Sequence, residues 1–383
     1  MDRFSFDHLG RNGRLRIAML VPPWYELPPA GYGGLEQMCA ALVDALVARG
    51  HDVTLIGAGT RSGTAATFVP TVPRPQYLRL GEGLPELLHV GRANLLIEEL
   101  DVDVVHDHTS AGLLTAGTRS APTVATVHCC PTGEQGDFLT TLGDTVSLVA
   151  ISTAQRRLRP DLPWAATVHN GLNTEGIADL PRDSRPPENG PVLWLARFNP
   201  DKGPDLAIQA CRQARLPLVL AGKCTEPAER RYLSEVIAPM VGSDAELVLN
   251  PDRKRCQALV RAARCLIMPI RWEEPFGMVM VEAMAEGPPV VARNRGAVPE
   301  LVRPGKTGLI CDDVSQLPDA LRQVTSIDPN ECIRHVRETF SADLMASRYE
   351  RVYRSVIRAS MTPESPALTA VGSSTSGSGT RAA

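Results

Sequence analysis

Three consecutive segments near the start of the sequence decide the fold: RIAMLVP at residues 16–22, LEQMCAALVDALVAR at 35–49 and VTLIGAG at 53–59. The first and third are short apolar runs of the kind that forms buried parallel strands. The middle segment repeats its apolar residues at helical spacing and ends before Gly50. A strand, a helix and a second strand in this order predict a βαβ unit.

The same alternation continues through the first half of the chain. Further strands are predicted at VDVVHDH (102–108), TVATVH (123–128), SLVAIS (147–152) and ATVHNG (166–171). The segment at residues 59–75 is rich in Thr, Pro and Gly, so we expect a loop there that lies over a cleft.

A second alternation starts after a short polar segment. Residues 180–190, LPRDSRPPENG, hold three prolines and no apolar run, which is typical of a linker between domains. PVLWLARF at 191–198 then opens a new series of strands and helices. The pattern predicts an α/β protein with two tandem Rossmann-like domains. The carboxyl ends of their strands face a central cleft, which is the default place for an active site.

The predicted domain boundaries follow from these segments. They are an N-terminal extension at residues 1–13, a first domain at 14–178, a linker at 179–190, a second domain at 191–342, a helix at 343–360 and a disordered tail at 361–383.

The composition narrows the class of protein. The chain has 383 residues, of which 43% are hydrophobic and 22% charged, and its formal net charge is −3. A dedicated nucleic-acid binder with a strongly basic domain is therefore disfavoured. The N-terminus has no apolar signal segment and no apolar run is long enough to span a membrane, which predicts a cytoplasmic protein. The nine cysteines are scattered without CxxC pairs, and this fits reduced thiols better than disulfides or structural zinc.

Lysine is rare in this chain, since only four of the 40 basic residues are lysine. One of them, Lys202, lies five residues after Arg197 in ARFNPDKG, directly after the first strand of the second domain. Two fixed cations at the carboxyl end of a strand suit a diphosphate that gains charge as it leaves.

A glycine-rich loop, Gly31-Tyr32-Gly33-Gly34, joins the first strand to the first helix. Glycines there allow close approach of the backbone and leave the amides of the helix N-terminus free to hold an anion. A dinucleotide fingerprint is disfavoured, because Glu36 stands where a third glycine is required and no acid ends the second strand.

The strongest site pattern is EPFGMVMVE at residues 274–282. Pro275 favours extended backbone at Glu274, and Gly277 allows a tight turn that points the amides near Met278 into the cleft. Glu282 follows about one helical turn later. The two carboxylates therefore reach different parts of one elongated ligand, and carboxylates accept hydrogen bonds from sugar and ribose hydroxyls.

The combination of GYGGLE, ARFNPDKG and EPFGMVMVEAMAEGPPVVARNRGAVPELVRPGKTGLI resembles the retaining glycosyltransferases of family 4, which have the GT-B fold. The resemblance covers roughly residues 14–358. It implies an N-terminal acceptor-binding domain, a C-terminal domain that binds a nucleotide sugar, and a last helix that crosses back to the first domain.

The resemblance also implies roles for single residues. Glu274 is expected to contact hydroxyls of the donor sugar, and Glu282 the ribose. His128, at the end of TVATVH, matches the cleft histidine that lies near the donor sugar and the acceptor. The residues expected to act in catalysis are Arg197, Lys202, His128 and Glu274, and those expected to bind the donor are Gly33, Gly34, Arg197, Lys202, Glu274, Phe276, Gly277, Met278 and Glu282.

Three positions depart from the pattern of the family. Asn173 stands in NGLN where NGVD is usual, Glu286 replaces a small residue or cysteine in AMAEG, and Ala297 replaces the second glycine of a common pair. None of them removes a charged ligand of the donor, so they bear on the choice of sugar or base and not on catalysis.

Two patterns resemble metal sites. His106 and His108 alternate on one face of a strand, but no third ligand has a suitable spacing. Asp101-x-Asp103 resembles the DxD of metal-dependent transferases, yet it opens a strand and does not end one at a cleft. No metal site is predicted.

These features predict a retaining, metal-independent glycosyltransferase that moves a sugar from a nucleoside diphosphate donor to an acceptor hydroxyl and needs no cofactor. The expected partners are this nucleotide sugar and a carbohydrate, lipid or metabolite acceptor, with no nucleic acid. Peripheral contact with the inner face of a membrane stays open, because similar enzymes make such contact. The alternatives are a sugar-nucleotide epimerase of the same fold and a non-catalytic sugar-nucleotide-binding protein.

Overall fold

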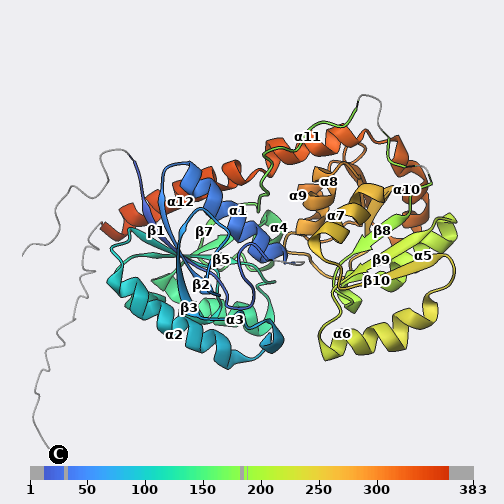
Figure 1. The fold of residues 1–383 in the computed structure, drawn as a ribbon. Helices are drawn as coiled ribbons and strands as arrows, with labels where there is room; N and C mark the ends of the chain where they lie inside the picture. Colours follow the sequence, from blue (N-terminus) through green and yellow to red (C-terminus); the bar gives the residue numbers. More distant parts are fainter. Residues whose placement is uncertain (1–12, 30–32, 182–184, 188, 362–383) are drawn as a thin grey trace, which may run out of the picture.

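The computed structural model describes residues 13–29, 33–181, 185–187 and 189–361. They form two α/β domains that lie side by side, each built on one parallel sheet (Figure 1). The fold class expected from the sequence is therefore confirmed. Most of the predicted extension at 1–13, Gly31 and Tyr32 of the glycine loop, and the predicted tail after Met361 lie outside the described residues.

The first domain contains a seven-stranded sheet in the order β3-β2-β1-β4-β5-β6-β7, with every neighbouring pair parallel. The inner strands of the sheet are short runs of Val, Ile, Leu and Ala that are buried on both faces, because helices cover both sides of the sheet. The strands are β1 (Arg16–Leu20), β2 (Asp52–Ala58), β3 (Thr67–Val72), β4 (Val104–Asp107), β5 (Thr123–Val127), β6 (Ser147–Ala150) and β7 (Trp164–Thr167).

The segment at residues 59–75 is only partly the loop expected from the sequence, because β3 lies within it. β3 is an edge strand that pairs with β2 alone. Pro70 has no amide hydrogen to donate, and an edge strand tolerates such a residue because one of its sides has no partner. The Pro, Thr and Gly content that argued for a loop is thus compatible with a strand at the edge.

The helices of the first domain are α1 (Gly34–Ala48), α2 (Gly83–Glu99), α3 (Gly133–Thr141) and α4 (Thr153–Leu158). The longer of them turn an apolar face to the sheet. Helix α1 follows β1 in the chain and precedes β2, as the βαβ pattern predicts.

The second domain contains a six-stranded parallel sheet in the order β10-β9-β8-β11-β12-β13. Its strands are β8 (Val192–Leu195), β9 (Leu218–Gly222), β10 (Ala245–Leu249), β11 (Cys265–Met268), β12 (Val290–Arg293) and β13 (Gly308–Cys311). Its helices are α5 (Pro204–Ala214), α6 (Pro227–Tyr232), α7 (Arg253–Ala262), α8 (Met278–Ala285), α9 (Val298–Leu301), α10 (Leu317–Gln323) and α11 (Pro329–Thr339).

The last helix, α12 (Ala342–Met361), follows the second domain in the chain but packs on the first (Figure 1). Tyr349 and Tyr353 are fully buried in the core that also holds residues of β1 and α1. The chain passes between the domains twice, and the two passages touch: the amide of Leu172 donates to Phe340 O at 2.8 Å, and the amide of Ala342 donates to Leu172 O at 2.7 Å.

Candidate active site

Helices α1 and α8 begin next to each other across the boundary between the two domains. Gly34 opens α1 and Met278 opens α8, and a β-carbon placed on Gly34 would lie 3.5 Å from Cβ of Met278. The positive ends of two helix dipoles and their free amides therefore meet at one place. This arrangement favours a bound anion, and it brings together Gly33, Gly34, Gly277 and Met278 from the residues expected to bind a donor.

Glu274 is buried beside Lys202, and their carboxylate and ammonium groups are in direct contact. The indole Nε1 of Trp272 donates to the same carboxylate at 3.0 Å, and the Lys202 ammonium lies 4.7 Å from the centre of the Trp272 ring. Lys202 ends a short 3₁₀ turn at Pro200–Lys202, and its carbonyl accepts from Trp194 Nε1 at 2.9 Å. The predicted sugar-binding carboxylate and a predicted phosphate-binding cation are thus neighbours.

The loop from Glu274 to Gly277, the donor loop, is held by backbone contacts. The amide of Ala297 donates to Glu274 O at 2.9 Å, and the hydroxyl of Ser152 from the first domain donates to Pro275 O at 2.6 Å. Gly277 has φ of +97°, which glycine adopts without strain. Phe276 is buried with its ring 6.0 Å from that of Phe340. Sequence reasoning did not identify Ser152.

Gly296 is required where the donor loop passes the segment before α9. Its φ is +53°, and a β-carbon there would overlap the backbone of Glu274. Its amide donates to Glu273 Oε2 at 2.7 Å. Gly296 therefore allows close packing against Glu274, and this packing fixes the position of the Glu274 backbone.

Arg197 lies at the carboxyl end of β8 and pairs with acidic side chains near the start of α6. Its guanidinium is exposed and lies 3.2 Å from Glu226 Oε1 and 3.7 Å from Glu229 Oε1. Arg197 thus contacts Glu226 and Glu229, whereas Lys202 contacts Glu274, and the role of Arg197 stays a prediction.

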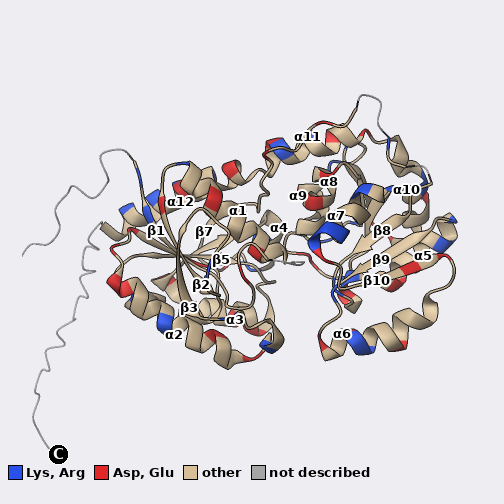
Figure 2. Ribbon diagram, in the orientation of Figure 1, with Lys and Arg blue, Asp and Glu red and all other residues tan. Residues whose placement is uncertain are grey.

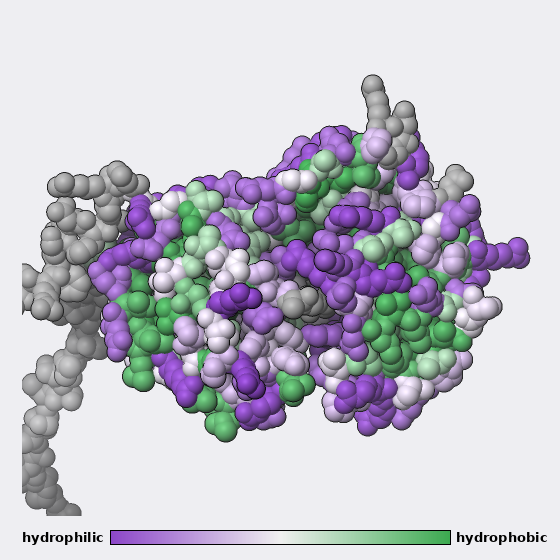
Figure 3. Space-filling model, viewed as in Figure 1, coloured by the Kyte–Doolittle hydropathy of each residue, from purple (hydrophilic) through white to green (hydrophobic). Residues whose placement is uncertain are grey.

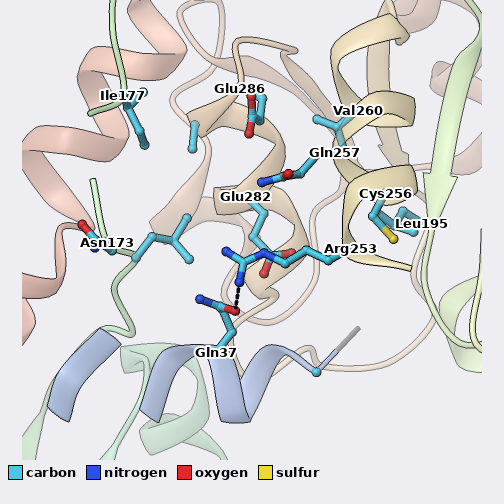
Figure 4. A pocket seen from close by; sticks show the side chains of 13 residues that line it. Gln37, Asn173, Ile177, Leu195, Arg253, Cys256, Gln257, Val260, Glu282 and Glu286 are labelled. Atoms are coloured by element: carbon cyan, nitrogen blue, oxygen red, sulfur yellow. Dashed lines mark hydrogen bonds between the residues drawn. The ribbon is translucent and has the colours of Figure 1, made fainter. Parts of the chain in front are cut away.

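Glu282 lies in a cavity between α7, α8 and the first domain (Figure 4). Burial raises the pKa of its carboxyl to about 7, although the nearby Arg253 opposes the shift. Arg253 donates to Gln37 Oε1 at 2.7 Å and so connects α7 with α1 across the cleft. Figure 2 shows basic residues gathered at this end of α7. No motif in the sequence pointed to Gln37.

Two of the three departures from the family pattern meet in the same cavity. Asn173 and Glu286 both line it with Glu282 (Figure 4). The Glu286 carboxylate accepts from Arg261 Nε at 2.7 Å. Ala297, the third departure, is buried under the donor loop.

A second cavity opens between loops of the two domains. Lys223 at the end of β9 contacts the hydroxyl of Tyr25, and its ammonium lies 4.1 Å from the centre of that ring. Tyr77 stacks on Tyr25 at a ring distance of 6.2 Å. The cavity is lined by Tyr25, Tyr77, Leu78, Leu80, Lys223, Thr225, Glu226, Pro227, Asn250 and Pro251.

His128 follows β5 at the carboxyl end of the first sheet. Its Nε2 lies 2.9 Å from Nδ1 of His108, and burial lowers the pKa of His128 to about 4, so the ring is neutral at pH 7. Gln155 holds the backbone on both sides of it, since Nε2 of Gln155 donates to Val127 O at 2.8 Å and to Cys129 O at 2.7 Å.

The patterns that resembled metal sites have other partners. His106 hydrogen-bonds to Tyr353 and Thr126, each at 2.7 Å. Asp103 pairs with Arg16 at 2.8 Å and so joins the starts of β4 and β1. Within the described part of the chain, no group of three or more His, Cys, Asp or Glu side chains could hold a metal ion. All nine cysteines are free thiols.

Comparison with known proteins agrees with this organisation. The family model described as glycosyl transferases group 1 matches residues 179–337, and the model described as glycosyltransferase family 4 matches residues 32–175. The glycogen synthase of Mycobacterium tuberculosis is 26% identical, over 91% of this chain and 97% of that protein. The phosphatidyl-myo-inositol mannosyltransferase of Mycolicibacterium smegmatis is 26% identical, over 89% and 90%.

A solved structure shares the two-domain fold. Anabaena HepE, crystallised with UDP and glucose, aligns with a TM-score of 0.67 at 18% identity, over 89% of this chain and all of that one. In the described residues, no helix has the length and apolar character needed to cross a bilayer.

Proposed function

This chain is a glycosyltransferase of family 4 with the GT-B fold, and from that premise we propose that it transfers a sugar from a nucleoside diphosphate donor to an acceptor hydroxyl with retention of configuration and without a metal ion. The observation that carries the proposal is the meeting of the α1 and α8 N-termini beside the Lys202–Glu274 pair. Such a donor requires helix N-termini and a cation that bind its anionic diphosphate, and a carboxylate that accepts hydrogen bonds from its sugar, all at one place.

In the proposed reaction, the bond between the anomeric carbon and the phosphate oxygen breaks, and its electron pair goes to the leaving diphosphate. The amides that open α1 and α8 and the Lys202 ammonium stabilise this growing charge. The acceptor oxygen bonds to the same face of the anomeric carbon. Its proton passes to the departing phosphate oxygen, so no protein nucleophile takes part.

The positions of the two carboxylates support a division of the donor between them. Glu274 lies at the donor loop with Lys202, where it accepts hydrogen bonds from sugar hydroxyls. Glu282, one turn into α8, accepts from the ribose. HepE was crystallised with UDP and glucose, and this supports a nucleoside diphosphate sugar as the donor class here.

We also propose that helix α2 binds to a membrane surface and that the acceptor lies at this surface. One face of α2 is buried at Pro85, His89, Ala93 and Ile97, while leucines at helical spacing on another face are exposed. They are Leu84, Leu87, Leu88 and Leu95. Figure 3 shows hydrophobic residues along this lower part of the first domain. Such a row of leucines can enter the interface of a bilayer.

The transferase proposal is tested by incubating the protein with a panel of nucleoside diphosphate sugars, with and without candidate acceptors, and separating the products. Release of nucleoside diphosphate that depends on acceptor, with an α-linked product from an α-linked donor, is expected. Donor consumption without acceptor and with formation of a free epimer would instead identify an epimerase. Activity that EDTA abolishes and Mn²⁺ restores would contradict the metal-free mechanism.

The membrane proposal is tested separately by co-sedimentation with phosphatidylcholine vesicles that contain 30 mole per cent phosphatidylglycerol as a probe composition. The wild-type protein is expected in the pellet. A variant with Leu84→Glu and Leu88→Glu is expected in the supernatant, and one with exposed Leu249→Glu, in the second domain, serves as the control. Equal sedimentation of all three proteins would discard the proposal.

A further inference from the structure

His108 lies behind His128 and is buried between it and Met19. Its Nδ1 is 2.9 Å from Nε2 of His128, and its Nε2 is 3.2 Å from the sulfur of Met19. The two imidazole rings lie 5.2 Å apart with an angle of 23° between their planes. His108 therefore has a defined neighbour at each of its ring nitrogens.

These two neighbours determine which nitrogen of His108 carries the proton. The thioether sulfur of Met19 can only accept a hydrogen bond, so Nε2 of His108 must be the donor toward it. Burial lowers the pKa of His108, so the ring is neutral and has one N–H. Its Nδ1 then has a lone pair and accepts.

The proton between the two rings must therefore come from His128. Nε2 of His128 donates to Nδ1 of His108, and since the His128 ring is neutral as well, its own Nδ1 has a lone pair. This Nδ1 has no hydrogen-bond partner among the described residues, and His128 is partly exposed. His128 directly follows β5 at the carboxyl end of the sheet, the end at which the substrates of the proposed reaction are expected to meet.

We propose that His108 is a positioning residue that keeps His128 in the Nε2–H form, so that Nδ1 of His128 accepts a hydrogen bond from a substrate hydroxyl. The recognition of a substrate hydroxyl rests on the proposed function, whereas the protonation pattern of the two rings follows from their contacts alone. Nδ1 of His128 then accepts a hydrogen bond from the hydroxyl and does not donate one to it. A substrate with an oxygen that offers no hydrogen at this position is disfavoured.

The surroundings of His108 support a positioning role. The ring centre of His106 is 4.1 Å from that of His108, and His106 is fixed by Tyr353 of α12 and by Thr126 of β5. The amide of His108 donates to Leu20 O at 2.9 Å. The His108 ring therefore has little freedom to turn, and the tautomer of His128 is set by a rigid partner.

The direct test is the ¹⁵N chemical shifts of the histidine rings in the intact wild-type protein at pH 7. For both His108 and His128, a protonated Nε2 and an unprotonated Nδ1 are expected, with the signals assigned by their loss in His108→Asn and His128→Gln. An Nδ1–H form of His128 would overturn the proposal. This measurement does not depend on activity, so it stands apart from failure of the proposed function.

The kinetic test compares His108→Leu with His108→Asn. Leucine cannot accept a hydrogen bond, and kcat is expected to fall about 10- to 100-fold, the range seen when the partner that orients a functional imidazole is removed. The KM for the donor should change less than about threefold, because the groups that bind the diphosphate are untouched. Asparagine, whose carboxamide oxygen can take the place of Nδ1, should restore most of kcat.

Thermal melting of both variants shows whether they fold. If His108→Leu turns over like the wild type, or if the asparagine variant folds but shows no recovery, His108 does not position His128. If His108→Leu does not fold, the asparagine variant and the chemical shifts decide the question.

Discussion

The hydroxyl of Ser152, in the first domain, donates a hydrogen bond to the carbonyl oxygen of Pro275, in the donor loop of the second domain, at 2.6 Å. Ser152 also caps α4, since its Oγ accepts from the amide of Gln155 at 2.9 Å. Gln155 in turn holds the backbone around His128. The first turn of α4 therefore fixes the position of the donor loop relative to the predicted catalytic histidine.

Replacing Ser152 by alanine removes both of these contacts. We expect the free energy of unfolding to fall by about 1 kcal/mol, the usual cost of a lost N-cap, and the KM for the donor to rise several-fold because the donor loop loses its anchor. Steady-state kinetics and chemical denaturation measure the two effects. Thr153→Ala is the control, since the side chain of Thr153 is exposed. A donor KM unchanged in Ser152→Ala would show that the contact does not position the loop.

Lys202 is expected to stabilise the leaving diphosphate. Lys202→Ala should lower kcat by roughly 10²- to 10³-fold, as is typical when one preorganised group that faces the developing charge is removed. The KM for the acceptor should change little. Lys306→Ala, at an exposed lysine in the turn before β13, provides a matched control with the same change of charge. Normal turnover in Lys202→Ala would remove this residue from the mechanism.

Donor binding is expected to depend on pH through Glu282. Because burial raises the pKa of this carboxyl to about 7, it is largely protonated below pH 6 and ionised above pH 8. The ionised form accepts hydrogen bonds from ribose hydroxyls better than the neutral acid, so donor affinity should increase as the pH rises from 6 to 8. Calorimetric titration with a nucleotide sugar measures this. Glu282→Gln should bind more weakly and show no such rise, and a parallel rise in that variant would assign the effect to another group.

Gly296 and Gly305 form a natural pair for testing the packing of the donor loop. Both have positive φ, but a β-carbon on Gly305 meets nothing within 4 Å, whereas one on Gly296 overlaps the backbone of Glu274. Gly305→Ala should cost about 1 to 2 kcal/mol of stability for its left-handed backbone and leave activity intact. Gly296→Ala should cost more and also lower kcat, because Glu274 must move. Equal losses of stability and activity in the two variants would contradict this account.

Most of the fold was predictable from the chain alone, because most buried parallel strands are short apolar runs that are followed by a helical pattern. The exception was β3, where Pro70 and the surrounding threonines resemble a loop. A continuous apolar run indicates a strand that is buried on both faces. An edge strand lacks one hydrogen-bonded neighbour and is less buried, so it needs fewer apolar residues. Its signal is therefore weak.

The candidate site was predictable only in part. The glycines and glutamates near the helix N-termini could be placed, because local turns decide where their backbones lie. The partners of these residues could not be, since they come from distant segments: Ser152 lies 123 positions from Pro275, and Gln37 lies 216 positions from Arg253. The pairing of Arg197 with Glu226, and not with a neighbour of Lys202, is likewise decided by packing between loops.

The packing of α12 on the first domain has a consequence for folding during synthesis. A ribosome delivers the chain from its N-terminus, and domains usually fold in the order in which they emerge. Here the first domain to emerge is the last to be completed, because Tyr349 and Tyr353 fill its core and are made only after the entire second domain. Until then the nascent chain exposes the face of α1 that α12 covers, and His106 lacks its partner Tyr353. Catalytic competence therefore depends on a helix that is made only after the whole second domain.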